Sequence, residues 1–247
     1  MHNSRILLVD IETAPNTVYV WGMYKQNISH EHVVANSYIL CWSAKWLGER
    51  GVDYDSTKRS GARRMLKRMH AKLDKADIVV HYNGLSFDVP ILNKEFLKHG
   101  MKPPAPYKQI DLLSVCRGAF RFDSNKLVAV TQYLGMATKL KHRGFQLWVG
   151  CMAGDAACWK EMERYNKRDV TVLETLYHRL LPWISRHPSL KLDRLACPKC
   201  SSTRTQKRGE MATAAASFQR YQCLACGGWF RSNRRKHTFQ GERGVNI

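Results

Sequence analysis

The first strand predicted from the sequence has to be buried, yet it carries two carboxylates on one face. Residues 6–9 form the apolar run Ile-Leu-Leu-Val, and Asp10 and Glu12 follow in the same predicted strand. Side chains two positions apart on a strand point to the same face. Two buried carboxylates repel each other and are costly without a counter-charge. The pattern therefore indicates a fold in which a cation binds beside this strand.

Two further aspartates lie in patterns with helical spacing. Asp88 follows the Asn-Gly turn at 83–84 and begins an apolar helical pattern, and Asp169 lies in a longer one, four residues after Tyr165. The four carboxylates thus come from one strand and two helices. A ligand set made only of oxygen favours Mg²⁺ or Mn²⁺ over zinc. The sequence predicts an acidic cation site built from three elements.

In this order and spacing, the three motifs resemble those of the DnaQ-like (DEDD) 3′→5′ exonucleases, a superfamily that includes the proofreading domains of DNA polymerases. The motifs are Asp-Ile-Glu-Thr at 10–13, Asn-Gly through Phe-Asp at 83–88, and Tyr-Asn-Lys-Arg-Asp at 165–169. The tyrosine four residues before the last aspartate resembles the third motif of the tyrosine subclass of these enzymes. The resemblance covers roughly the first three quarters of the chain. It implies an α/β, ribonuclease-H-like fold with a mixed five-stranded sheet and helices on both faces.

The resemblance also implies a role for each acid in the hydrolysis of phosphodiester bonds with two Mg²⁺ or Mn²⁺ ions. Asp10 would bridge both ions, Glu12 and Asp169 would complete the site that activates water, and Asp88 would hold the second ion directly or through water. Each of the last two has a structural alternative. Asp88 could cap its helix, and Asp169 could pair with a basic residue on its own helix.

Tyr165, Asn83 and Phe87 are the other candidates that the motifs supply. Tyr165 would orient the attacking water, because an ordinary phenol pKa near 10 makes it a poor base at neutral pH. Asn83 and Phe87 would help to place the terminal nucleotide. The alternatives are a core position for Tyr165 and Phe87 and a simple turn position for Asn83.

Four of the eight cysteines form two close pairs near the C-terminal end. Two residues separate Cys197 from Cys200 and Cys223 from Cys226, and 22 residues lie between the pairs. Without a secretory signal, this spacing favours one tetrahedral structural zinc over disulfides. The two pairs resemble the knuckles of a zinc ribbon of the kind found in transposases and other nucleic-acid proteins. The other four are predicted to be buried thiols: Cys41, Cys116, Cys151 and Cys158.

The net charge of +20 points to a polyanionic partner, and nucleic acid is the first candidate. Residues 186–247 carry 13 Lys or Arg against three acids, so about half of the excess lies there. Candidate contacts fall in a basic loop at 139–150, on the hairpin between the cysteine pairs and in a basic tail. They are Lys139, Lys141, Arg143, Arg204, Lys207, Arg208, Arg231, Arg234, Arg235 and Lys236. A ribbon that docks a protein is the alternative.

The predicted organisation is an exonuclease domain at 1–188, a linker at 189–195, the zinc ribbon at 196–232 and a basic tail at 233–247. Strands are predicted near 6–12, 17–24, 38–46, 51–54, 77–81 and 110–112, and helices at 61–75, 88–97, 126–134 and about 157–184. Several aromatic residues could stack on bases, although most are expected in the core: Tyr19, Trp21, Tyr24, Trp42, Trp46 and Trp148.

The sequence thus predicts a metal-dependent 3′→5′ exonuclease with DNA favoured over RNA and with a replication or repair protein as partner. No apolar stretch is long enough for a membrane helix, so the expected location is the cytoplasm. The sequence contains no phosphate-binding loop motif, so a nucleotide cofactor is not expected. An exoribonuclease or structure-specific endonuclease using the same site is one alternative. A non-catalytic nucleic-acid adaptor acting through the ribbon is another.

Overall fold

A computed structural model describes residues 4–136, 143–189 and 196–238. The chain divides into two compact units, one from Arg5 to Tyr177 and one that contains the chain from His178 onward. Each unit is described by itself. Among the described residues, no helix combines the length and the apolar character that crossing a bilayer requires.

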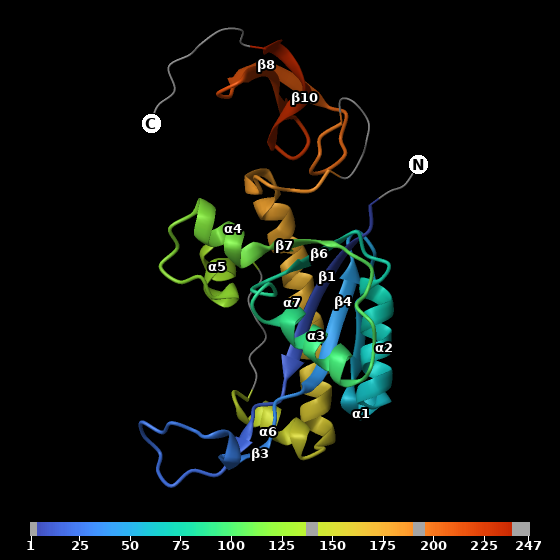
Figure 1. Cartoon of the computed structure of the whole chain (residues 1–247), viewed down its shortest axis with the longest axis vertical. Helices are drawn as coiled ribbons and strands as arrows, with labels where there is room; N and C mark the ends of the chain where they lie inside the picture. Colours follow the sequence, from blue (N-terminus) through green and yellow to red (C-terminus); the bar gives the residue numbers. More distant parts are fainter. Residues whose placement is uncertain (1–3, 137–142, 190–195, 239–247) are drawn as a thin grey trace. The chain divides into compact units, whose positions relative to one another are not determined.

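The larger unit is built on a mixed five-stranded sheet with the strand order β5-β4-β1-β6-β7 (Figure 1). The strands are β1 (Ile6–Thr13), β4 (Ile39–Trp46), β5 (Asp53–Ser56), β6 (Ile78–His81) and β7 (Lys108–Asp111). β4 pairs antiparallel with β1 and β5, whereas β6 pairs parallel with β1 and β7. The predicted fold class, a mixed five-stranded sheet with flanking helices, is confirmed.

Helices cover both faces of the sheet and are numbered in chain order. They are α1 (Thr57–Ser60), α2 (Ala62–Leu73), α3 (Asp88–Lys98), α4 (Leu112–Ala119), α5 (Leu127–Tyr133), α6 (Gln146–Met152) and α7 (Ala156–Leu180). α7 is followed by the 3₁₀ turn η2 (Leu181–Trp183), which contains Pro182. The long last helix was predicted to reach residue 184; it ends earlier because proline cannot donate the helical hydrogen bond.

The alternation along β1 sorts its side chains between two hydrophobic clusters. Leu7, Val9 and Ile11 pack with apolar residues of α2 and α3 on one face. Asp10 and Glu12, at the alternate positions, point to the other face, where residues of α6 and α7 pack against β4 and β5. The strand therefore buries one side in the core and presents its two acids toward α7.

Two segments differ from the prediction. The strand predicted at 17–24 is only the two-residue β2 (Thr17–Val18), which pairs with β3 (Val33–Ala35) after the 3₁₀ turn η1 (His30–His32). The loop predicted at 139–150 contains the start of α6 at Gln146. The basic, glycine-containing sequence does not indicate this helix, because its packing rests on contacts of Leu147 and Cys151 with buried residues of α7 rather than on an apolar pattern of its own.

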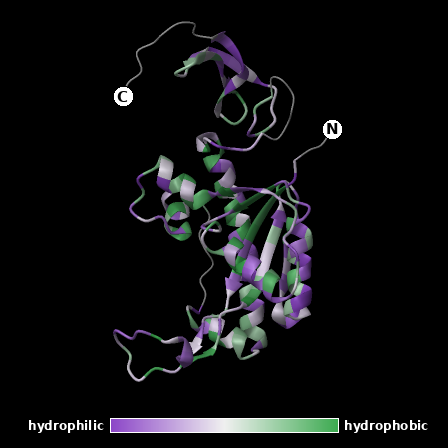
Figure 2. Ribbon diagram, viewed as in Figure 1, coloured by the Kyte–Doolittle hydropathy of each residue, from purple (hydrophilic) through white to green (hydrophobic). Residues whose placement is uncertain are grey.

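The C-terminal unit contains a three-stranded antiparallel sheet in the order β10-β9-β8, which Figure 2 shows as mostly hydrophilic. Its strands are β8 (Thr205–Ala212), β9 (Ala216–Cys223) and β10 (Trp229–Thr238). The hairpin predicted between the cysteine pairs is β8 and β9. Arg234, Arg235 and Lys236, which the sequence analysis placed in a basic tail, lie on β10.

Candidate active site

The structure brings together three of the four predicted acids. Asp10 and Glu12 of β1 and Asp169 of α7 each offer a carboxylate oxygen, and these oxygens lie within 4.8 Å of one another. The strand supplies two acids on one face, and the helix that packs over that face supplies the third. Carboxylate oxygens are the ligands that hard divalent cations such as Mg²⁺ prefer, and these three are close enough to share one cation.

Asp88, the fourth predicted acid, lies beside this group and not within it. It sits in the first turn of α3, and its Oδ1 accepts a hydrogen bond of 3.1 Å from the backbone N–H of Ile11. Ile11 lies between Asp10 and Glu12, so this bond ties α3 to the acidic strand. The helix-cap alternative does not describe this contact, because the bonded N–H belongs to another element.

The acids raise one another's proton affinity. Burial raises the pKa of Asp10 well above its usual value, and the neighbouring carboxylates of Glu12, Asp88 and Asp169 raise it further. Burial likewise raises the pKa of Asp88 to about 7. Without a cation, the group therefore retains protons that a bound cation would displace.

Metal binding is expected to release protons and to tighten as the pH rises through 7. A cation binds the ionised carboxylates, so the protons held on Asp10 and Asp88 have to leave. Titration calorimetry with Mg²⁺, in buffers of different ionisation enthalpy below and above pH 7, measures this release. Affinity that is equal on both sides of pH 7, with no proton released, would contradict it.

Asn166 is a site residue that the sequence analysis missed. It is fully buried on α7, and its Nδ2 donates a 2.5 Å hydrogen bond to Oδ2 of Asp10 and a longer one, 3.4 Å, to the Asp10 carbonyl oxygen. This amide fixes the orientation of the Asp10 carboxylate. Its spacing could have identified it from the sequence, because Asn166 lies three residues before Asp169 and therefore on the same side of the helix.

Trp148 is a second residue whose position the sequence did not predict. It lies on α6, and its indole Nε1 donates a 3.2 Å hydrogen bond to Oε2 of Glu12. Its ring also meets Tyr165 edge to face, with centroids 6.0 Å apart. Trp148 therefore connects α6 to β1 through Glu12 and to α7 through Tyr165.

Tyr165 is buried in the cluster between the sheet and α7, and its hydroxyl interacts with Asp169 and lies close to Glu12 and Asp10. Burial raises its pKa, and the charges of Asp169, Glu12 and Asp10 raise it further. The phenol therefore stays protonated near neutral pH. The ring therefore packs in the core, while the hydroxyl lies close to the carboxylates.

The second motif is a turn held by His81 and Asp111. His81 Nδ1 accepts from the backbone N–H of Gly84 at 3.1 Å, and Asp111 Oδ1 accepts from the N–H of Asn83 at 2.9 Å. Burial lowers the pKa of His81, so its neutral imidazole accepts this hydrogen bond. A Cβ at Gly84 would lie 2.3 Å from His81 Cγ, which explains the glycine.

Asn83 takes the turn position with a positive φ of 68°. The core alternative for Phe87 is wrong, because its ring is exposed just before Asp88, as is Leu85. The second motif therefore presents apolar side chains to solvent next to the acid.

The basic candidates named from the sequence fall in two separate segments of the chain. Lys139 and Lys141 lie outside the described residues. The guanidinium of Arg143 pairs with Glu161 at 3.0 Å, so its charge is partly neutralised. Six others lie on strands β8 and β10, Lys207, Arg208, Arg231, Arg234, Arg235 and Lys236, with Arg204 just before β8. The Lys236 ammonium pairs with Glu210.

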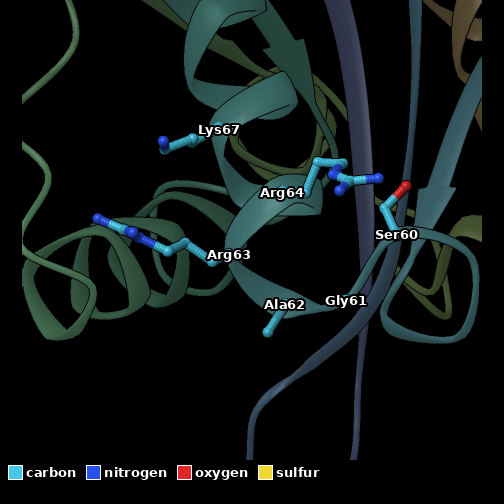
Figure 3. Close-up of a pocket in the computed structure, with 6 residues that line it drawn as sticks. All are labelled: Ser60, Gly61, Ala62, Arg63, Arg64 and Lys67. Atoms are coloured by element: carbon cyan, nitrogen blue, oxygen red, sulfur yellow. The ribbon is translucent and has the colours of Figure 1, made fainter.

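A surface pocket of about 470 Å³ lies at the start of α2, lined by Ser60, Gly61, Ala62, Arg63, Arg64 and Lys67 (Figure 3). α2 packs on the face of the sheet opposite to the acids. This basic pocket is therefore not the acidic site, and its arginine side chains project outward, as expected for a solvated face.

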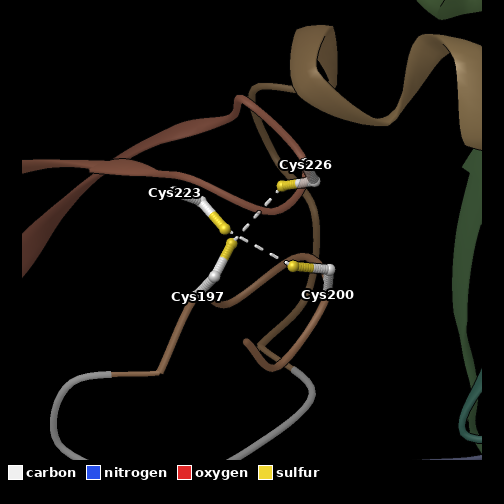
Figure 4. A group of neighbouring side chains, drawn as sticks. All are labelled: Cys197, Cys200, Cys223 and Cys226. Atoms are coloured by element: carbon white, nitrogen blue, oxygen red, sulfur yellow. Dashed lines mark hydrogen bonds between the residues drawn. The ribbon is translucent and has the colours of Figure 1, made fainter. Parts of the chain in front are cut away.

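The four cysteines of the C-terminal unit converge on one point (Figure 4). The Sγ atoms of Cys197 and Cys226 are 3.8 Å apart, and those of Cys200 and Cys223 are 3.6 Å apart. A tetrahedron with Zn–S bonds of 2.3 Å has edges of about 3.8 Å, so the four sulfurs fit one zinc ion.

The surroundings of Cys223 favour a thiolate. Burial raises its pKa, but hydrogen bonds from the backbone N–H groups of Cys226 and Ala225 outweigh that effect and bring the pKa to about 7. The cluster is compatible with a zinc ribbon.

A ribonuclease-H-like sheet with an acidic group between β1 and α7 defines the class of this protein. Residues 47–181 match the RNase_H superfamily, and the chain belongs to that superfamily. The matched segment contains Asp88, Tyr165 and Asp169, whereas Asp10 and Glu12 precede it.

Among solved structures, the chain is similar to the family B DNA polymerase from the hyperthermophilic archaeon Pyrobaculum calidifontis, with a TM-score of 0.56 and 17% identity. The similarity covers 72% of this chain but only 25% of the polymerase chain. At this identity the similarity establishes the fold. No curated protein sequence matches the chain.

Proposed function

We infer that the protein is a metal-dependent 3′→5′ exonuclease that hydrolyses phosphodiester bonds at the 3′ ends of nucleic acid. The observation that carries this proposal is the convergence of the Asp10, Glu12 and Asp169 carboxylates within 4.8 Å, beside a buried tyrosine. Superfamily membership supports nuclease chemistry in general. The tyrosine four residues before Asp169 supports the tyrosine subclass of the DnaQ-like enzymes.

The acids would hold two Mg²⁺ or Mn²⁺ ions, which supply a nucleophile from water near neutral pH and a counter-charge for the leaving oxygen. Asp10 has the central position, because Glu12, Asp88 and Asp169 all raise its pKa. Asn166 keeps one Asp10 oxygen oriented while the other stays available. Asp88, outside the closest group, would act through an intervening water.

Tyr165 would orient the attacking water as a hydrogen-bond donor, because its raised pKa excludes a base at neutral pH. We expect Tyr165→Phe to bind metal and substrate nearly as the wild type does and to turn over about 10- to 1,000-fold more slowly. Single-turnover cleavage with saturating Mn²⁺ measures the rate. An unchanged rate would leave Tyr165 with a packing role only.

DNA is favoured as substrate because the similar structure is a DNA polymerase. A replication or repair protein is the corresponding partner. The proposed domains are the exonuclease domain at 1–188, a linker at 189–195, a zinc ribbon at 196–232 and a tail at 233–247, of which the residues to Thr238 continue β10.

The ribbon would grip the strand through one face of its sheet. Arg220 of β9 lies opposite Arg231 of β10, and Trp229 lies two residues before Arg231, so all three share a face. The Arg220 guanidinium lies 5.2 Å from the Trp229 ring, and that of Arg231 lies 3.7 Å from Phe218. Cations interleaved with aromatic rings suit phosphates and bases together. Arg220 was missing from the sequence candidates.

Cleavage of labelled oligonucleotides with Mn²⁺ tests the proposal. We expect a ladder that shortens from the 3′ end of single-stranded DNA. Internal cuts would make the protein an endonuclease, and preference for an RNA strand would make it an exoribonuclease. Binding without cleavage would identify a nucleic-acid adaptor that acts through the ribbon, and it would overturn the proposed activity.

A further inference from the structure

Residues 17–35, here called the aromatic arm, expose large side chains that the sequence analysis expected in the core. Tyr19, Trp21 and Tyr24 are 77%, 97% and 87% exposed, and Met23 and Val20 are exposed beside them. By contrast, Trp42 is fully buried. Soluble proteins rarely keep contiguous large apolar side chains in water, so such a surface marks an interaction site.

The arm leaves the domain at the acidic end of the sheet. β1 ends at Thr13, one residue after Glu12, and the chain returns into β4, which pairs with β1 at Glu12 and Thr13. Two hydrogen bonds close the base: Ala14 N–H to the Tyr38 carbonyl at 2.9 Å and Ser37 N–H to Asn16 Oδ1 at 2.6 Å. The base of the arm is thus fixed next to the acids.

The arm's own chemistry suits bases better than phosphates. The only acid in residues 17–35 is Glu31, and the only lysine or arginine is Lys25, so its tip offers neutral rings. Within the arm, Tyr19 N–H donates to the His32 carbonyl at 3.0 Å, which holds the two sides together. Aromatic rings stack on any base, and they do so without sequence preference.

Exposed apolar side chains also flank the acids on two other elements. Leu85 and Phe87 are exposed in the turn before Asp88. Phe145 and Val149 are exposed beside Trp148, whose indole bonds Glu12. Faces of bases are available to such side chains in a single strand and are covered in a duplex.

We propose that the aromatic arm is a stacking platform for the unpaired bases of a single strand whose 3′ end occupies the acidic site. The ligand class is single-stranded nucleic acid, and the net charge of +20 favours it over a neutral or basic protein partner. This inference rests on the proposed exonuclease function for the direction of the strand. The extended run from Thr17 to Tyr24 reaches at most roughly 25 Å, so bases several nucleotides from the 3′ end would meet it.

Fluorescence anisotropy of labelled oligonucleotides tests the arm in the full chain. Trp21→Ala and Tyr24→Ala are made in an Asp10→Asn background, so that no strand is cut and no chelator removes zinc. We expect roughly 5- to 150-fold weaker binding of an oligonucleotide of about twelve nucleotides for each variant, and little change for one of about three or for a blunt duplex. Trp21→Phe keeps a ring and should retain most of the affinity.

Trp183→Ala is the matched control, because Trp183 is a 60% exposed tryptophan outside the aromatic arm, in η2 after the end of α7. Affinity of Trp21→Ala equal to that of Trp183→Ala would overturn the inference. So would a wild-type dimer in sedimentation that Trp21→Ala dissociates, since the arm would then be a self-association surface.

The outcome for the arm is separable from that for the enzyme. Cleavage by the wild type with no effect of Trp21→Ala on binding would retain the exonuclease and remove the arm's role. Trp21-dependent binding of single strands by a wild type that cuts nothing would retain the platform and remove the exonuclease.

Discussion

The Asp10→Ala variant is expected to lose cleavage at least about 1,000-fold, because removing the central carboxylate dismantles the positions of both metal ions. Glu12 and Asp169 would be left without the carboxylate that interacts with both of them and with Asp88. Single-turnover cleavage of a 3′-labelled single strand with Mn²⁺ measures the loss. Asp10→Asn, which keeps the shape and the Asn166 contact, separates the charge from the packing.

Asp123→Asn is the matched control, since Asp123 is an exposed aspartate on another segment of the same unit. It should cleave as the wild type does. Substantial hydrolysis by purified, folded Asp10→Ala would move the chemistry away from the acidic group, whatever the effect on binding.

The Asp10→Asn variant should be no less stable than the wild type when metal is absent. The folded-state pKa of Asp10 is raised, so the folded protein binds more protons than the unfolded chain, and its stability falls as the pH rises above the usual aspartate value. Asp10→Asn removes that loss. Thermal unfolding at pH 8 should therefore favour the variant, and the difference should shrink near pH 4.

The features that the sequence predicted well are those fixed by local pattern. The apolar run before Asp10 defines a buried strand, and the two-residue spacing of Asp10 and Glu12 gives one face whichever strands pair beside it. Tyr165 and Asp169 share a helix face through their four-residue spacing. The order of the motifs then supplied the fold.

Features that depend on contacts between distant segments were not predictable in this way. Asn166 reads as an ordinary polar residue until α7 is packed over β1, which brings its amide to Asp10. Trp148 depends on α6 in the same manner. β-branched and aromatic residues at 17–24 favour a strand, but no periodicity reveals that the neighbouring segment fails to cover them.

Loss of the cysteine cluster should weaken nucleic-acid binding by the C-terminal unit and leave hydrolysis at the acidic group intact. The buried apolar residues described in the three-stranded sheet are few, chiefly Ala216, Phe218 and the cysteines themselves. A sheet with so little core is expected to need a bound metal ion for folding, and the cysteine cluster is where zinc is proposed to bind. Replacing both Cys197 and Cys200 with serine is therefore expected to abolish zinc content and unfold β8 to β10. The acidic group, within the unit that ends at Tyr177, should still hydrolyse short substrates.

Without the folded three-stranded sheet, the protein should bind longer strands more weakly, and the salt dependence of this binding should fall. If this sheet and its basic residues neutralise about three to five phosphates, ending the chain near Ser189 should flatten the log–log salt slope by roughly 2 to 4 units. The cysteine variant should show part of that change, because its basic residues remain on an unfolded segment. Cys116→Ser, a buried cysteine outside the cluster, should keep its zinc and its slope. A truncated protein with unaltered affinity and slope would instead assign the ribbon to a protein partner, since phosphates it does not contact cannot contribute counterion release.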